Sequence, residues 1–159
     1  MSIRQRDYLL RMIDQLAHAI GRAMFARKAG NLEEAQQIVQ ETADGLLGPV
    51  RAMVEKVDAS SAALLLGSHE KITAYALLVA EEAMIQEAAG EPRAKSSHRR
   101  ALELHLESAR LGKEVSEVAL TSIEALHGKV DLERLAPRYR EVLDRLPRPT
   151  PSDPDDGPG

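Results

Sequence analysis

A long amphipathic stripe that ends at a glycine is the feature that most constrains the fold of this chain. Between about residues 3 and 29, apolar residues recur at steps of three and four, the spacing of one helix face. These residues are Leu9, Ile13, Leu16, Ile20 and Met24. Gly30 follows, and a glycine at this place ends a helix because it adopts the left-handed conformation without strain. Asn31 then stands at an N-cap with Glu34 three residues later, a capping-box spacing, so we expect a helical hairpin whose second helix reaches about Asp44.

The remainder of the chain has the same helical character. Cys and Trp are absent and only 3% of the residues are aromatic. A chain this poor in aromatic residues and rich in Ala, Leu, Glu and Arg favours helix over sheet. The expected further helices are a short one from Pro49, an apolar piece ending at Gly67, one from Ser68 to about Ala89, two between Ser97 and His127 that separate near Gly112, and a last one from Pro137 to about Leu146. We therefore expect an all-α protein, with the helix of residues 68–89 at its centre.

The domain organisation follows from where the apolar residues stop. Residues 147–159 contain Pro, Asp and Gly but no apolar side chain that a core could bury. Such a segment is expected to be a disordered tail. Residues 1–146 are expected to form a single all-helical domain.

The charges are arranged in blocks along the chain. The net charge is +4 over residues 1–29, −8 over 30–91, +4 over 92–113 and −4 over 114–159. Blocks of this kind are typical of neighbouring helices that present complementary faces to one another. The chain as a whole is acidic and has few aromatic stacking residues, so we expect no nucleic-acid partner.

We expect a cytoplasmic protein with no membrane partner. The longest apolar run, Ala74–Ala80, is far shorter than the roughly 20 residues that span a bilayer. The first residues include no apolar run followed by a cleavage site, so no signal peptide is predicted.

The two longest predicted helices end in a similar way, which indicates an internal repeat. Gly30 and Gly90 each end a long helix, and each has an alanine seven positions earlier, Ala23 and Ala83. The two glycines are about 60 residues apart, whereas a regular tetratricopeptide array repeats every 34 residues. The repeat therefore predicts two related hairpins in an irregular arrangement.

Three stretches carry a resemblance to a known family. Residues 29–35, Ala-Gly-Asn-Leu-Glu-Glu-Ala, resemble the turn between the helices of a tetratricopeptide repeat. Together with residues 7–13 and 101–106, they make the chain similar to an uncharacterised bacterial family of helical proteins with tetratricopeptide-like hairpins. The resemblance implies an all-α fold of antiparallel helical hairpins stacked in an irregular, tetratricopeptide-like array. It implies no activity, no cofactor and no catalytic residues.

Metal binding is the alternative that the side chains suggest. Glu124 and His127 form a Glu-x-x-His unit, the spacing used in di-iron helical bundles, and His18 could add a third ligand. A di-iron site needs a second such unit, which the chain lacks. We keep a helical bundle that binds a metal or a small ligand between helices as the alternative function.

The leading prediction is a non-enzymatic domain for protein–protein interaction or scaffolding. Stacked hairpins offer an extended binding surface, and no nucleophile elbow or phosphate loop is present in the sequence. The expected partner is another protein or a second copy in a homodimer, the latter favoured if Tyr8 and Phe25 lie outside the core stripe. A basic run is a candidate contact patch. Its members are Arg93, Lys95, Arg99 and Arg100.

Overall fold

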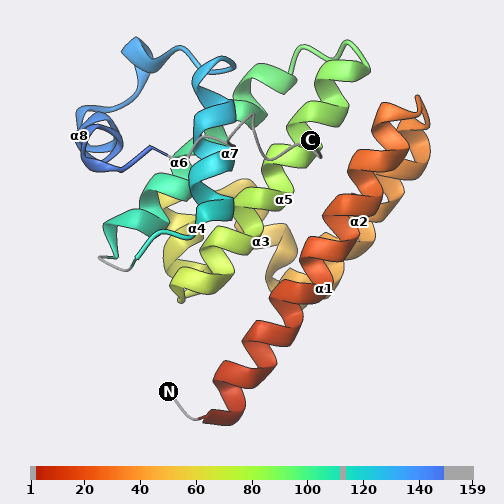
Figure 1. The fold of residues 1–159 in the computed structure, drawn as a ribbon, viewed down its shortest axis with the longest axis horizontal. Helices are drawn as coiled ribbons and strands as arrows, with labels where there is room; N and C mark the ends of the chain where they lie inside the picture. Colours follow the sequence, from red (N-terminus) through yellow and green to blue (C-terminus); the bar gives the residue numbers. More distant parts are fainter. Residues whose placement is uncertain (1–2, 112–113, 149–159) are drawn as a thin grey trace, which may run out of the picture.

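A computed structural model of the chain describes residues 3–111 and 114–148 (Figure 1). Every regular element within those residues is helical, which confirms the all-α prediction. The α-helices are α1 (Ile3–Lys28), α2 (Leu32–Leu47), α3 (Arg51–Lys56), α4 (Ala59–Leu66), α5 (His69–Ala88), α6 (Ala94–Arg110), α7 (Glu117–His127) and α8 (Pro137–Arg145). Two short 3₁₀ turns are η1 (Gly48–Val50) and η2 (Leu132–Arg134). The predicted tail lies outside the described residues from residue 149 onward.

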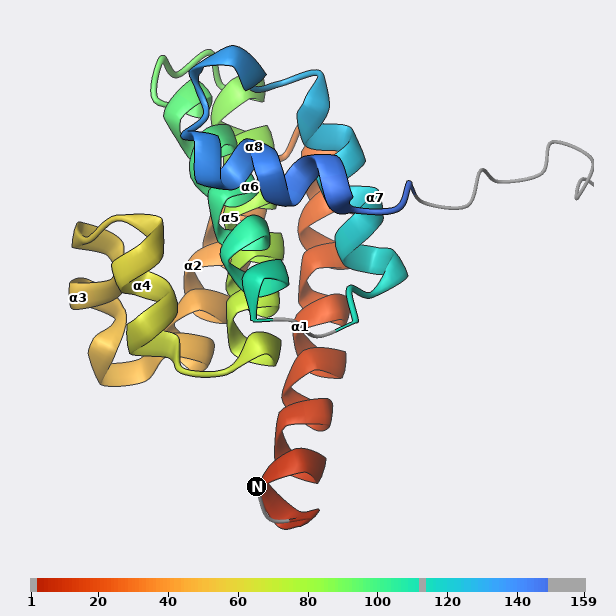
Figure 2. The ribbon, with the colours of Figure 1, turned by 90° about the vertical axis from the view of Figure 1, so that its left-hand side faces the viewer.

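Two helical hairpins form the body of the molecule, α1 with α2 and α5 with α6. Helix α5 joins them, because it contacts both α1 and α2 on one side and α6 on the other. Helices α3 and α4 come between the hairpins in the chain, and α7 and α8 pack on α6. The first turns of α1 extend beyond every other helix (Figure 2). A regular tetratricopeptide array is not shown by this arrangement, in which the α3–α4 segment separates the hairpins.

The turn of each hairpin has the same backbone hydrogen bonds. The Asn31 amide donates to the Ala26 carbonyl at 2.8 Å, and the Gly30 amide donates to Arg27 at 3.0 Å. The same two bonds close the second turn, where the amides of residues 91 and 90 donate to the carbonyls of residues 86 and 87 at 2.9 and 3.0 Å. Gly30 and Gly90 have φ of 85° and 72°. This is the Schellman motif, in which glycine takes the left-handed position, and it confirms the predicted turn.

The predicted capping box at this turn is wrong. Asn31 is the N-cap of α2, but within the described residues its side chain makes no capping hydrogen bond. Its backbone lies at φ −87° and ψ 69°, whereas an N-cap that reaches the helix amides has extended backbone. By contrast, α4 and α5 have side-chain caps, because the side chains of Asp58 and Ser68 accept hydrogen bonds from the amides of Ser61 and Lys71.

Alanine substitutions should have opposite effects at two glycines of the first hairpin. Gly30→Ala should lower the free energy of unfolding by about 1 kcal/mol, because a side chain strains the left-handed backbone. Gly45 lies within α2, and a Cβ there would meet no atom within 4 Å in the described part of the chain. Gly45→Ala should therefore raise the free energy of unfolding by roughly 0.5–1 kcal/mol. Urea denaturation of both variants measures the two changes in the free energy of unfolding. Changes of the same sign would contradict the left-handed geometry of the turn.

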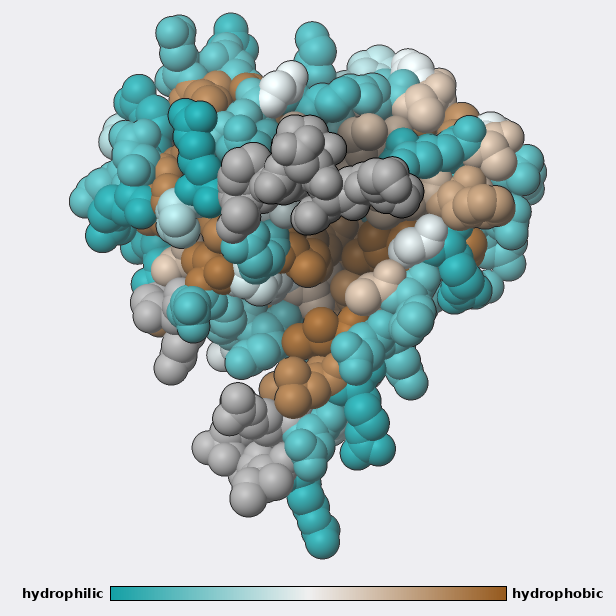
Figure 3. All heavy atoms as spheres, in the orientation of Figure 1, coloured by the Kyte–Doolittle hydropathy of each residue, from teal (hydrophilic) through white to brown (hydrophobic). Residues whose placement is uncertain are grey.

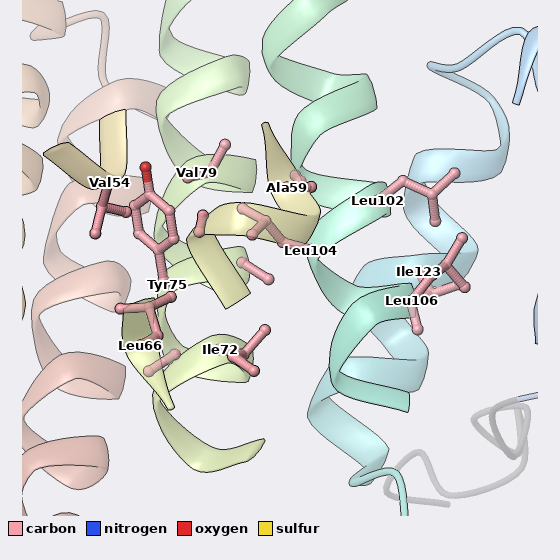
Figure 4. Close-up of a cluster of buried hydrophobic side chains, with 14 of the residues drawn as sticks. Val54, Ala59, Leu66, Ile72, Tyr75, Val79, Leu102, Leu104, Leu106 and Ile123 are labelled. Carbon is pink, nitrogen blue, oxygen red and sulfur yellow. The ribbon is translucent and has the colours of Figure 1, made fainter. Parts of the chain in front are cut away.

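The core rests on aliphatic side chains around α5 and α6. Ile72, Tyr75, Leu102, Leu104 and Leu106 are buried together in it (Figure 4). A second, smaller cluster lies between α1, α2 and α5 and is made largely of alanines that let these helices approach closely. Its buried members are Ala23, Ala26, Ala35, Val39, Ala43, Leu78 and Ile85. Helix α5 is buried over most of its surface, which confirms its predicted central place.

Candidate protein-interaction site

Helix α1 is held on the body by a buried ion pair. The Arg27 guanidinium on α1 donates through Nε to Oε1 of Glu81 on α5 at 2.7 Å. The two side chains are only 13% and 5% exposed. Burial raises the pKa of the Glu81 carboxyl, and the hydrogen bond from Arg27 opposes that rise. The pair anchors one face of α1, and so determines which face of the helix points outward.

The opposite face of α1 carries five exposed residues in one line. They are Asp14, Ala17, Gly21, Phe25 and Lys28, which we call the outer stripe. The core-facing residues of the same helix, such as Leu16 and Ala23, are buried, and they lie roughly half a turn away at 3.6 residues per turn. Phe25 is 79% exposed. A large aromatic ring on the outer face of a helix that is otherwise well packed marks a candidate contact surface.

Tyr8 and Phe25 lie outside the core stripe, which is the condition under which the sequence favours a homodimer. Both are exposed, at 64% and 79%. They do not share a face, however, because residues 17 positions apart are separated by roughly 100° around a helix of 3.6 residues per turn. Only Phe25 belongs to the outer stripe.

Gly21 at the middle of the outer stripe is not explained by the packing of a single chain. It lies inside a 26-residue helix, where glycine is less stable than alanine by about 1 kcal/mol. Apart from the chain neighbours of Gly21 and the nearby backbone of its own helix, a Cβ at this position would meet no atom of the described residues within 4 Å. The fold therefore does not need a glycine here, just as it does not need one at Gly45. What distinguishes Gly21 is its place in the outer stripe beside the exposed ring of Phe25, where a glycine fits a close approach from outside the chain.

A groove of about 500 Å³ runs beside the outer stripe, between α1 and α2. Its lining includes the small residues Ala17 and Gly21 and the apolar residue Ile38. Arg22 from α1 and Glu34 from α2 line it as well. This mixture of small, apolar and charged side chains fits an incoming side chain from another helix.

The predicted metal ligands occupy two different places. Glu124 and His127 contact each other on α7, with 3.6 Å between Oε2 and Nδ1. His18 lines the groove on α1. Within the part of the chain that the structure describes, no group of three or more His, Asp or Glu side chains is arranged to hold a metal ion. The three residues are thus not gathered into one cluster.

The predicted basic patch divides into two pairs. Arg93 and Arg100 line a polar pocket between α2, α3, α5 and α6, whereas Lys95 and Arg99 line another pocket beside Asp131. Two of the guanidinium groups already have partners. Arg93 donates to Glu91 at 2.6 Å. Arg100 donates to the carbonyls of Val54 and Val57 at 2.7 and 2.6 Å and lies 5.8 Å from the centre of the Tyr75 ring.

The polar pocket itself was missed by sequence reasoning. It measures about 410 Å³. Glu82 and Gln86, one turn apart on α5, line it together with Gln40 of α2. Burial raises the pKa of the Glu82 carboxyl, and the buried Gln86 Oε1 has no hydrogen-bond partner among the described residues. The sequence did contain a signal for this pocket, because Glu82 and Gln86 are two polar residues on a helix that was predicted to be central. None of Glu124, His127 and His18, the residues predicted for the ligand-binding alternative, lines this pocket.

Hydrophobic atoms also reach the surface on the side of α1 that faces the other helices (Figure 3). There the first turns of α1 extend past their neighbours, and Leu9, Met12 and Ile13 are half-buried. No helix among the described residues is long and apolar enough to cross a membrane.

The chain was compared with protein-family models, curated proteins and solved structures, and none of the three comparisons found a match. No family is identified for it.

Proposed function

We propose that this protein is a non-enzymatic interaction domain that binds a helix of another protein chain on the outer face of the α1–α2 hairpin. In this proposal the α1–α2 and α5–α6 hairpins stack in the manner of tetratricopeptide hairpins, with α5 as the shared layer. The observation that carries the proposal is Phe25, a ring that is 79% exposed beside a groove of about 500 Å³. Exposed aromatic anchors beside such grooves are typical of helix-binding surfaces.

The rest of the surface supports the same site. One arginine of α1, Arg22, and one acidic residue of α2, Glu34, line the groove. A helix with both signs of charge along its length would find complementary groups there. Arg27 fixes the orientation of α1 through its buried pair with Glu81, so the surface is held in place before a partner arrives.

Photo-crosslinking tests this proposal directly. We expect a benzophenone amino acid at position 25 to form a covalent adduct with a protein, either in a preparation of the pure chain or in an extract of the native host. The same group at Glu141, an exposed residue on α8, serves as the matched control and should form at least about tenfold less adduct. Equal yields at the two positions, or no protein adduct at position 25 under either condition, would contradict the proposal.

A further inference from the structure

The outer stripe has a symmetric spacing around its glycine. Asp14 and Lys28 lie seven residues before and after Gly21, and Ala17 and Phe25 lie four residues before and after it. These are also the intervals at which residues return to one helix face. In the outer pair Asp14 is acidic and Lys28 is basic. In the inner pair Ala17 is small and Phe25 is large.

We infer that the outer stripe binds the outer stripe of a second copy of this chain, with the two α1 helices antiparallel and crossing at Gly21. The inference rests on the proposed function and names its partner. In a two-fold arrangement, each residue meets the residue at the equal distance on the other side of the axis. Lys28 then faces the partner's Asp14, and Phe25 faces the partner's Ala17.

Each of these contacts accounts for a feature that the packing of a single chain does not explain. The ring of Phe25, 79% exposed in one copy, covers the small residues Ala17 and Gly21 of the other. The groove of about 500 Å³ next to those residues gives the ring space. Gly21 lies on the axis and permits the two helices to approach closely, because its Cβ position is open beyond its chain neighbours and the nearby backbone of its own helix. Small residues at a crossing allow that approach in helix pairs generally.

Charge complementarity favours a second copy over an unrelated partner. A parallel arrangement would place Lys28 against another Lys28, which is unfavourable. The antiparallel arrangement produces two Lys28–Asp14 pairs related by the axis. Both charges are exposed in one copy, and Lys28 also acts electrostatically on Glu81 of its own chain. One stripe thus supplies both halves of a self-complementary interface.

The absence of cysteine from the chain makes a single introduced thiol a specific reporter of this geometry. Two α-helices that pack 8–10 Å apart bring facing Cα atoms to about 3.4–5.4 Å, which overlaps the range for a disulfide. We expect Gly21→Cys, in the pure full-length chain under mild oxidation, to form a disulfide-linked dimer at least about tenfold faster than the exposed control Glu141→Cys. Equal rates for the two variants would overturn the inference.

Charge exchange in the Gly21→Cys background separates a second copy from another partner. Lys28→Asp should slow the cross-link about tenfold, and the added change Asp14→Lys should restore it, because both interchain pairs are then reversed. Failure of the double variant to recover would also overturn the antiparallel register. If position 25 cross-links to a different protein while Gly21→Cys gives no dimer, the inference fails and the proposed function stands. If position 25 yields no adduct at all, the proposed function fails.

Discussion

Replacing Arg27 with alanine should lower the free energy of unfolding by about 3–5 kcal/mol at pH 7.5, because it leaves the Glu81 carboxylate buried without its cation. Glu81 is 5% exposed and its pKa is already raised by burial while Arg27 is present. Without the guanidinium, ionised Glu81 has lost its main compensation. Urea denaturation of the wild type and of Arg27→Ala at pH 7.5 measures this loss.

Two controls show whether the loss comes from the unpaired charge. Arg93→Ala removes an arginine from an exposed pair with Glu91 and should change the stability by less than about 1 kcal/mol. The double variant Arg27→Met with Glu81→Leu removes both charges and should recover most of the stability. A loss below about 1 kcal/mol for Arg27→Ala, similar to that of the exposed pair, would contradict the role given to Arg27.

Acidification should destabilise the protein through His105, by about 2 kcal/mol between pH 7.5 and pH 5. His105 on α6 is 2% exposed, and burial lowers its pKa from 6.5 to about 4. The unfolded chain therefore binds a proton on this side chain below about pH 6.5, whereas the folded chain binds it only near pH 4. The contribution of neutral His105 to the free energy of unfolding is present in full above pH 6.5 and is lost as the pH falls toward 4.

The comparison with His105→Gln isolates this contribution. Burial also lowers the pKa of His98 and raises that of Glu81, and both groups remain in the variant. Glutamine can keep a hydrogen bond to the Ser122 hydroxyl, which lies 3.0 Å from His105 Nε2. Urea midpoints from pH 7.5 to 5 should fall less in His105→Gln than in the wild type. Parallel pH profiles for the two proteins would show that His105 does not titrate as described.

Much of the backbone could be predicted from local sequence signals. The turn after α1 follows from one glycine and the end of one apolar stripe, both of which act within a few residues. The extent of α1 and α8 and the caps at Asp58 and Ser68 are local in the same way, and they agree with the structure. The capping box at Asn31 failed because it depends on the backbone angle of the turn, which the residue types alone do not determine.

The buried polar contacts could not be predicted because their partners are distant in the chain. Arg27 and Glu81 are 54 residues apart. Tyr139 and Glu107, whose buried hydrogen bond of 2.7 Å joins α8 to α6, are 32 residues apart. The charge blocks anticipated complementary helices in general, but not which residues would meet.

The candidate site was predicted only in part. The exposed position of Phe25 follows from helical periodicity, since the ring falls outside the apolar stripe. The groove beside it depends on how α2 packs against α1, and the open space at the Cβ position of Gly21 depends on the packing of the surrounding helices. The basic run divided because its members point to different sides of α6.

The mass of the pure chain in solution tests the central claim, that the outer stripe of α1 binds protein and that its partner is a second copy. In sedimentation equilibrium at micromolar concentrations, we expect twice the monomer mass of 17.4 kDa for the wild type. Phe25→Ser removes the anchor ring from an exposed position without disturbing the core, and it should sediment as a folded monomer. A monomeric wild type, or a dimer that Phe25→Ser leaves unchanged, would contradict this account.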